Sequence, residues 1–197
     1  MAGRGKGTKS KRYLRIIGGR WRGRKLAFSP APGLRPTGDR VRETLFNWLA
    51  ADLPGARCID LFAGSGALGL EALSRGAEHC DFVDCSTAAI RDIAGHLATL
   101  DASARAYCQV STAEEFVKRA RSDYDLVFLD PPFDSNLLDP ILANLPLRLL
   151  RPGAAVYVES AATSPPPIAP RHWQLHRDQR AGEVRYQLFR LPQQADL

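Results

Sequence analysis

Five short, mostly apolar runs, the first four of them each followed by a segment with helical spacing, constrain the fold of this 197-residue chain more than any other feature. Because the runs are mostly apolar, we expect them to pair as parallel strands in a sheet that helices cover on both faces. The sequence therefore predicts a doubly wound α/β fold. The expected strands are 57–62, 79–84, 105–110, 124–130 and 154–160, and the expected helices are 67–75, 86–100, 112–122 and 136–149.

The two ends of the chain predict hairpins. Residues 173–179 and 184–190 have strand character with no helix between them, so we expect a C-terminal antiparallel hairpin at one edge of the sheet. Residues 13–28 contain two apolar-rich runs around Gly18 and Gly19, which predicts a small basic β-hairpin with a tight turn. After a proline-rich connection, Thr37 or Asp39 is expected to cap a helix over 41–50.

We expect four regions along the chain. They are a disordered basic tail (1–12), the hairpin and linker (13–36), the main domain (37–191) and a flexible C-terminus (192–197). No apolar run approaches the length of a membrane span, and the basic N-terminus is followed by no apolar signal segment. The expected compartment is the cytoplasm. The four cysteines form no CxxC pair, so we expect reduced, mostly buried thiols and no metal site.

The positive charge is concentrated at the N-terminus. The chain has 27 Lys and Arg against 21 Asp and Glu, a net charge of +6. Residues 1–25 carry ten of the bases and no acid, which leaves 17 bases against 21 acids in the remainder. Such clustering favours a polyanionic partner, because bound phosphates release counterions. A solvated tail that only aids solubility is the alternative for the first ten residues.

A glycine-rich turn follows the first expected strand of the sheet. Residues 60–69, DLFAGSGALG, place Gly64, Gly66 and Gly69 in the spacing GxGxxG. Such a turn lets the backbone approach a nucleoside, and Asp84 at the end of the next strand is placed to bind ribose hydroxyls. The glycines suit NAD and S-adenosyl-L-methionine equally. Asp60 favours the second, because its carboxylate can bind an ammonium and would repel a pyrophosphate, although it could simply cap the loop.

The second informative motif is Asp130-Pro131-Pro132-Phe133, where the fourth strand ends. An amino group conjugated to a base ring becomes nucleophilic when hydrogen-bond acceptors favour its pyramidal form. The Asp130 carboxylate and the Pro131 carbonyl can be those acceptors, and Phe133 offers a face on which a base taken out of its stack can lie. An ordinary Asp-Pro turn is the alternative. Together with the upstream glycine turn, the motif predicts methylation of an exocyclic amine.

With these motifs assembled, the sequence resembles the bacterial 16S rRNA guanine-N2 methyltransferases of the RsmD family, which are specific for guanine 966. The resemblance extends over about residues 13–190. It implies a class I methyltransferase (Rossmann-like) fold, S-adenosyl-L-methionine as methyl donor, and a guanine amine of 16S rRNA as acceptor. The segments that carry it are 15–26, 34–49, 60–77, 130–133, 157–160 and 173–188.

The resemblance also implies site residues. The segment with Thr37, Arg40 and Arg42 resembles the part that closes over the cofactor, where an Arg could pair with the methionine carboxylate or simply lie on an exposed helix face. Two positions depart from the family: Asp84 replaces a common glutamate, and Ser111, Thr112 and Ala113 stand where an Asp or Asn often faces adenine. The implied cofactor-binding residues are Thr37, Arg40, Asp60, Phe62, Ala63, Gly64, Ser65, Gly66, Asp84, Cys85, Thr112 and Ala113.

The basic hairpin is then expected to contact RNA phosphates. Trp21 within it could stack on a base or pack against the domain. The expected RNA-binding residues are Arg15, Arg20, Trp21, Arg22, Arg24 and Lys25. We expect a monomer that acts on 16S rRNA, with a small-subunit assembly particle as the expected substrate.

Three other functions remain open from the sequence. The Asp130 motif suits N6-adenine or N4-cytosine methylation as well. A non-catalytic ribosome-assembly factor could retain the cofactor turn, and an NAD-dependent dehydrogenase could use the same glycines.

Overall fold

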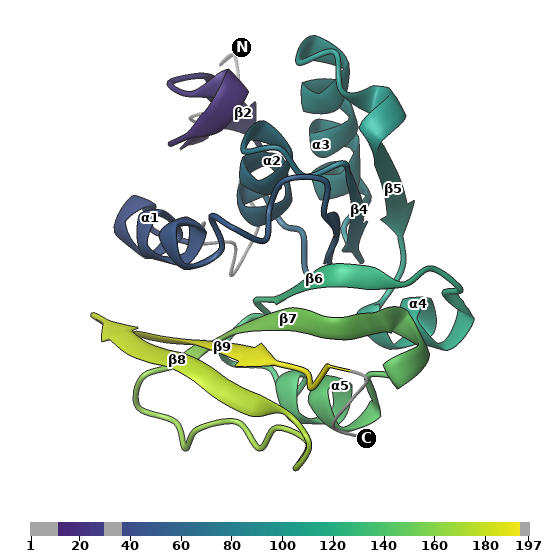
Figure 1. Cartoon of the computed structure of the whole chain (residues 1–197). Helices are drawn as coiled ribbons and strands as arrows, with labels where there is room; N and C mark the ends of the chain where they lie inside the picture. Colours follow the sequence, from purple (N-terminus) through teal and green to yellow (C-terminus); the bar gives the residue numbers. More distant parts are fainter. Residues whose placement is uncertain (1–11, 30–36, 194–197) are drawn as a thin grey trace, which may run out of the picture.

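The computed structural model describes residues 12–29 and 37–193, and it contains one seven-stranded mixed sheet in the order β5-β4-β3-β6-β7-β9-β8 (Figure 1). The strands β3 to β7 are parallel, and β9 pairs antiparallel with both β7 and β8. The predicted doubly wound sheet and its C-terminal hairpin are confirmed. The bounds are β3 (Arg57–Asp60), β4 (His79–Asp84), β5 (Ala106–Val110), β6 (Tyr124–Leu129), β7 (Leu150–Ala161), β8 (Gln174–Ala181) and β9 (Val184–Arg190).

Alternate strand residues face the two helical layers, as the twofold repeat of a strand requires. Cys58, Leu126 and Ala155 belong to the core beneath α1, α2 and α3, whereas Ile59 and Val127 belong to the core beneath α4 and α5. Both layers are visible in Figure 1. The helices are α1 (Asp39–Trp48), α2 (Ala67–Ser74), α3 (Thr87–Thr99), α4 (Ala113–Arg119) and α5 (Leu138–Asn144), with 3-10 turns η2 (Ser103–Arg105) and η3 (Leu147–Leu149).

The last expected helix, 136–149, is interrupted. The α5 helix ends at Asn144, and Leu145 adopts an extended conformation before Pro146. A residue that precedes proline is sterically disfavoured in helical conformation, which explains the break.

The N-terminal hairpin forms, but without the tight turn that Gly18 and Gly19 predict. The strands β1 (Arg12–Arg15) and β2 (Lys25–Phe28) are joined by a longer connection that contains the 3-10 turn η1 (Gly19–Trp21). Helix α2 holds this connection: the Glu71 carboxylate accepts hydrogen bonds from the N–H groups of Ile17 (2.8 Å) and Gly18 (2.7 Å). These contacts with a distant helix override the local turn preference.

The predicted cap of the first helix is also wrong. Gly38 occupies the N-cap position of α1, and no side chain caps the helix. Both candidate side chains have other partners: the Thr37 hydroxyl donates to Asp130 (3.0 Å), and Asp39 pairs with Arg42 (2.7 Å).

Several expectations lie outside the described residues, namely those for the tail 1–11, the linker 30–36 and the last residues 194–197. Within the described ranges, no helix has the length and apolar character needed to cross a membrane.

Candidate active site

A cavity of about 920 Å³ lies at the carboxyl ends of the parallel strands. Here the chain order of the strands reverses, with β4 on one side of β3 and β6 on the other, which is where open α/β sheets bind ligands. The volume falls within the range of small-molecule sites, about 300–1,000 Å³. The predicted residues that line it are Thr37, Asp60, Phe62, Ala63, Gly64, Ser65, Asp84, Cys85, Thr112, Ala113, Asp130, Pro131, Pro132 and Phe133.

The glycine turn is a preformed backbone structure. Gly64 and Gly66 have positive φ values of 50° and 79°, a region that side-chain-bearing residues rarely adopt. The Gly64 N–H donates to Asp84 (2.8 Å), and the Ala63 N–H donates to the Val83 carbonyl (2.9 Å). Gly66 is the N-cap of α2 and does not line the cavity, so its part is to shape the turn.

Asp60 is 1% exposed, and its two carboxylate oxygens differ. Oδ2 accepts the Gly69 N–H (3.2 Å), whereas Oδ1 has no partner among the described residues. Burial, with smaller contributions from nearby Asp130 and Asp84, raises the pKa of Asp60 to about 7. One oxygen therefore supports the start of α2, and the other leaves a buried acceptor on the cavity wall that suits an ammonium group.

The cavity is strongly acidic. Among the described lining residues there are eight carboxylates and no Lys, Arg or His. Such a lining attracts a cation and repels a pyrophosphate. The eight are Asp60, Asp84, Asp92, Glu114, Asp130, Asp134, Glu159 and Glu183.

Asp84 lies at the end of β4 and holds the turn in addition to lining the cavity. Its Oδ1 accepts the Ser86 N–H (2.7 Å), and its Oδ2 accepts the Gly64 N–H. Each carboxylate oxygen can accept more than one hydrogen bond, so lone pairs remain available for a hydroxyl donor.

Asp130 directly follows β6 and is half-buried. Burial raises the pKa of Asp130, and hydrogen bonds from Thr37 and Glu159 lower it. The net result is a pKa of about 6. Phe133, three residues later, is 41% exposed at the cavity. A carboxylate acceptor and an accessible aromatic ring therefore lie in the same cavity as the glycine turn.

The sequence reasoning missed Glu159 as a site residue. This side chain is 2% exposed on β7, lines the cavity, and accepts a hydrogen bond from the Tyr157 hydroxyl (2.7 Å). The available signal was a carboxylate that directly follows the run 154–158, AAVYV, in the sequence. The cavity wall also includes Gly182 and Glu183 of the β8–β9 turn, which no motif indicated.

Neither Arg40 nor Arg42, the two arginines that could pair with the methionine carboxylate of the cofactor, lines the cavity. Arg42 is 1% exposed and is held by Asp39, by Glu71 (3.5 Å) and by the carbonyls of Thr37 and Arg15. It ties α1, α2 and the hairpin together, so it is not free to bind a ligand. Arg40 is exposed and does not line the cavity.

The basic hairpin presents its cations to solvent but buries its tryptophan. Arg15, Arg20, Arg22, Arg24 and Lys25 are exposed. Trp21 is 5% exposed and packs in the core, with the Arg105 guanidinium 5.9 Å from its ring centre. The stacking alternative for Trp21 is therefore wrong, because almost none of the ring is accessible to a base.

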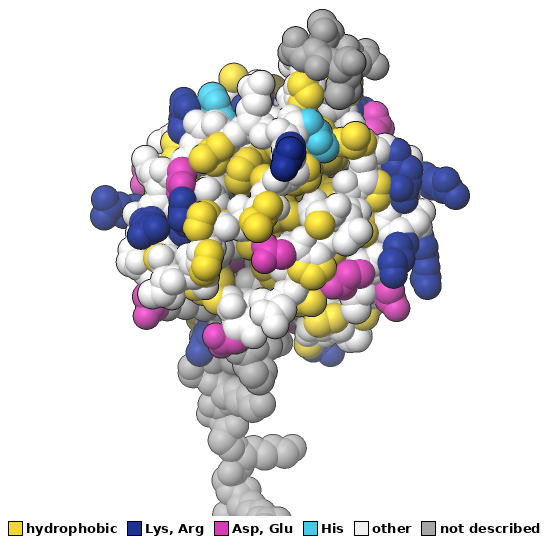
Figure 2. Space-filling view, turned by 90° about the horizontal axis from the view of Figure 1, so that it is seen from below, with side chains coloured by type: hydrophobic (Ala, Val, Ile, Leu, Met, Phe, Trp, Pro, Cys, Tyr) yellow, Lys and Arg dark blue, Asp and Glu magenta, His cyan; other side chains and the backbone are white. Residues whose placement is uncertain are grey.

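Cations are not confined to the hairpin. Figure 2, a view from below, shows Lys and Arg side chains on both flanks of that face, with apolar side chains between them. The N-terminal hairpin leads into the cavity, since Phe28 at the end of β2 and Ser29 directly after it line the cavity wall.

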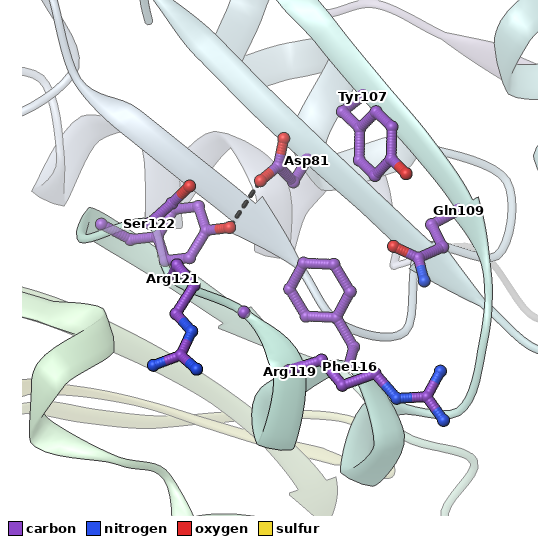
Figure 3. Close-up of a pocket in the computed structure, with 9 residues that line it drawn as sticks. Asp81, Tyr107, Gln109, Phe116, Arg119, Arg121 and Ser122 are labelled. Atoms are coloured by element: carbon purple, nitrogen blue, oxygen red, sulfur yellow. Dashed lines mark hydrogen bonds between the residues drawn. The ribbon is translucent and has the colours of Figure 1, made fainter.

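A second, smaller cavity of about 220 Å³ lies near the amino ends of β4 and β6 (Figure 3). Tyr107 and Phe116 contribute aromatic rings to it, and the carboxylate of Asp81 is engaged by His79 (2.7 Å) and by the Tyr124 hydroxyl. None of the predicted site residues lies there.

The cysteines are free thiols. Cys58 and Cys80 are buried, Cys108 is partly buried, and Cys85 is exposed beside the cavity. In the described parts of the chain, no group of three or more His, Cys, Asp or Glu side chains is placed to hold a metal ion.

Two curated relatives resemble this chain over nearly their whole length. Ribosomal RNA small subunit methyltransferase D of Escherichia coli (strain K12) is 46% identical over 184 residues, 93% of this chain and 92% of that protein. The protein of the same name from Haemophilus influenzae is 41% identical, over 91% of this chain and 95% of its own length.

Solved structures agree with the fold. The Escherichia coli methyltransferase yhhF has a TM-score of 0.82 and 46% identity, and the match covers 92% of this chain and 99% of that one. An RNA methyltransferase from Salinibacter ruber, solved with S-adenosyl-L-homocysteine, is 15% identical with a TM-score of 0.61 over 80% of this chain and 94% of its own, a likeness in fold alone. These matches confirm the class I methyltransferase fold.

The family model described as conserved hypothetical protein 95 matches residues 14–190, which is nearly the same span as the resemblance found in the sequence. The chain therefore belongs to the conserved hypothetical protein 95 family, together with the proteins named ribosomal RNA small subunit methyltransferase D.

Proposed function

We propose that this protein transfers a methyl group from S-adenosyl-L-methionine to the exocyclic N2 amine of a guanine in 16S rRNA, at the position numbered 966 in the family. The observation that carries the proposal is the single acidic cavity that joins the glycine turn to Asp130 and Phe133. The names of the close relatives support small-subunit ribosomal RNA as the substrate.

The residues present fit the cofactor. The unpaired Oδ1 of Asp60 would accept the methionine ammonium, and Asp84 would accept the ribose hydroxyls. When bound, S-adenosyl-L-methionine supplies a methyl group already activated by a sulfonium. Its two positive centres, at the ammonium and at sulfur, match a lining of eight acidic side chains better than the pyrophosphate of NAD does.

The Asp130 motif would prepare the acceptor. The Asp130 carboxylate and the Pro131 carbonyl accept hydrogen bonds from the two N–H bonds of the amine, so its lone pair is directed at the methyl group. Phe133 holds the base by stacking, which contributes about 1–3 kcal/mol. Because the donor is already activated, positioning of the two reactants supplies most of the remaining acceleration.

The substrate would be held by its phosphates. The exposed cations of the hairpin supply affinity, whereas phosphate contacts carry no sequence information. We therefore propose that the structure of a small-subunit assembly particle contributes the specificity. The protein would act there as a monomer in the cytoplasm.

The test is methylation of small-subunit particles that lack the modification, followed by analysis of the labelled nucleosides. We expect N2-methylguanosine from the wild type. Asp130→Ala should give at least about 100-fold less product while still binding S-adenosyl-L-methionine, because Asp130 contacts the acceptor and not the donor.

Other outcomes would contradict the proposal. Full activity of Asp130→Ala would contradict the role of Asp130 in preparing the amine. Label in N6-methyladenosine or N4-methylcytidine would show that the acceptor is an adenine or a cytosine and not a guanine. Binding of the particle and of S-adenosyl-L-methionine without any turnover would support a non-catalytic assembly factor, and a melting-temperature shift with NAD alone would support the dehydrogenase.

A further inference from the structure

Asp130 and Glu159 lie side by side on neighbouring strands. The parallel pairing of β6 and β7 ends with Leu129 opposite Val158, and Asp130 and Glu159 are the next residue of each chain segment. The alternation of the strands directs Phe128 and Tyr157 to the core beneath α1 and α2, so Asp130 and Glu159 fall on that same face. Both line the cavity.

We propose that Glu159 is a positioning residue, which carries a proton at neutral pH and donates it as a hydrogen bond to the Asp130 carboxylate, so that Asp130 presents its free lone pairs to the acceptor amine. This inference rests on the proposed function, because it assigns a partner to the residue that contacts the amine.

The surrounding hydrogen bonds define the direction of this contact. Oε1 of Glu159 accepts from the Tyr157 hydroxyl (2.7 Å), and Oδ2 of Asp130 accepts from the Thr37 hydroxyl (3.0 Å). The Tyr157 hydroxyl thus holds Glu159, and the Thr37 hydroxyl holds Asp130 and also contacts Glu159. A carboxyl O–H between the two acids is then the contact that satisfies both.

The charges around the pair favour one proton on it. The titratable groups that face it are Asp60 from β3, Tyr157 on β7 and Tyr186 from β9, all of them acids. No cation of the described chain lines the cavity. Two adjacent carboxylates, one of them buried, cannot both ionise without a large electrostatic cost.

Burial decides which acid keeps the proton. Glu159 is 2% exposed, and burial together with the Asp130 charge raises its pKa well above the usual range of a glutamate. Asp130 is the more accessible of the two, and its pKa is about 6. Near pH 7, Asp130 is therefore the acceptor and Glu159 the donor.

The pair also accounts for the proton that the reaction releases. The amine nitrogen forms a bond to the methyl carbon as the bond from carbon to sulfur breaks, and the electron pair of that bond remains on sulfur. One N–H proton of the amine passes to Asp130. The pair then carries two protons and is neutral, and the more accessible Asp130 returns one of them to water.

The experiment compares Glu159→Gln, Glu159→Leu and the matched control Glu43→Gln, which lies on the exposed face of α1 outside the cavity. The readouts are kcat between pH 5 and 8, KM for S-adenosyl-L-methionine and circular dichroism. The Gln amide still donates to Asp130, so Glu159→Gln should retain kcat within about threefold. Glu159→Leu removes the donor and should lower kcat by about tenfold or more with little change in KM.

The acid limb of the pH profile separates positioning from a merely structural role. A donated hydrogen bond favours ionised Asp130, so its loss in Glu159→Leu should move the acid limb to higher pH, while Glu159→Gln leaves the limb near its wild-type position. A limb that stays in place in Glu159→Leu, or a Glu159→Gln variant as inactive as Glu159→Leu, would overturn the proposal.

A second readout does not depend on methyl transfer. In carbon-13 NMR of the wild-type protein, the Glu159 carboxyl should be protonated at pH 7, and an ionised Glu159 would overturn the proposal. If Glu159 is protonated but the protein methylates no guanine, the proposed function is contradicted. The assignment of the proton to Glu159 would still hold.

Discussion

At the scale of single residues, Asp60 shows how burial prepares a binding group. One oxygen of its carboxylate accepts the Gly69 N–H, and the other has no partner among the described residues. Its pKa of about 7 means that Asp60 is partly protonated at neutral pH before the cofactor binds. An ammonium group binds only the ionised form, so cofactor binding and deprotonation of Asp60 are linked.

This linkage predicts the pH dependence of cofactor affinity. Between pH 7.5 and 5.5 the affinity for S-adenosyl-L-methionine should fall, approaching tenfold per pH unit at the acid end, because each binding event must remove a proton from Asp60. Calorimetry in two buffers with different ionisation enthalpies measures the released proton.

Two variants control this prediction. Asp60→Asn should bind more weakly and release no proton, whereas Asp130→Asn should keep the pH dependence, because Asp130 contacts the acceptor. A wild-type affinity that is constant from pH 5.5 to 7.5 would contradict the role given to Asp60.

The raised pKa of Asp130 predicts that a neutral replacement of this residue stabilises the protein, and that the gain depends on pH. The pKa of Asp130 is about 6 in the folded protein against the ordinary aspartate value of 3.8, so the folded state holds the proton more tightly. The stability from this proton is present below about pH 4 and is lost as pH rises through 6. Asp130→Asn should therefore raise the free energy of unfolding by about 1–2 kcal/mol at pH 7.5 and by much less at pH 4.5. Urea denaturation at both pH values tests this, and an equal effect at both would contradict it.

The site residues that could be predicted from the sequence are those at the carboxyl ends of parallel strands. Asp60, Asp84 and Asp130 each end or follow a parallel strand, and such ends converge at one edge of a sheet. Arg42 and Trp21 could not be placed in this way, because their burial depends on contacts with α2 and the hairpin that are distant in sequence.

At the scale of elements, Gly69 shows that the third glycine of the turn serves packing. A Cβ atom at Gly69 would lie 2.2 Å from the Phe82 ring and 2.8 Å from the Cys80 sulfur, both on β4. The absent side chain therefore lets α2 lie close against the sheet.

This contact predicts that Gly69→Ala is destabilising by about 1–3 kcal/mol in spite of the better helix propensity of alanine. Gly95→Ala in α3 is the matched control, because nothing lies within 4 Å of a Cβ built there. It should be stabilising by about 0.5–1 kcal/mol. Thermal unfolding of both variants measures the difference, and two variants of equal stability would show that the packing argument is wrong.

The basic hairpin predicts a salt-dependent contribution to RNA binding. Replacing Arg22, Arg24 and Lys25 by alanine should weaken binding to small-subunit particles and lower the slope of log affinity against log salt by about one per lost phosphate contact. Filter binding at several salt concentrations measures both quantities.

The control removes the same number of cations elsewhere. Lys118, Arg119 and Arg121 lie at the C-terminal end of α4 and just beyond it, near the small cavity at the amino ends of the strands. Their replacement by alanine should leave the affinity and the slope nearly unchanged. Equal losses in both triple variants would show that net charge alone drives binding.

At the scale of the whole molecule, charge is divided between two surfaces. The cavity is lined by carboxylates, and the hairpin that leads into it carries exposed cations. A cationic cofactor and a polyanionic substrate can therefore bind next to each other without competing for the same groups.

The overall fold was predictable because apolar strands and amphipathic helices alternate along the chain, and parallel strands joined by helices admit few arrangements. The connection between β1 and β2 was not predictable, because the N–H groups of Ile17 and Gly18 donate to Glu71, more than 50 residues away. Glu159 was missed for a related reason: its partner Asp130 becomes a neighbour only when β6 and β7 pair.

The most direct test of the central claim is to map modified nucleotides in 16S rRNA from cells that lack the gene and from the same cells with the wild-type gene or Asp130→Ala restored. We predict that one N2-methylguanine, at the position numbered 966 in the family, is missing without the gene, returns with the wild type and stays missing with Asp130→Ala. An unchanged modification pattern in cells without the gene would contradict the account.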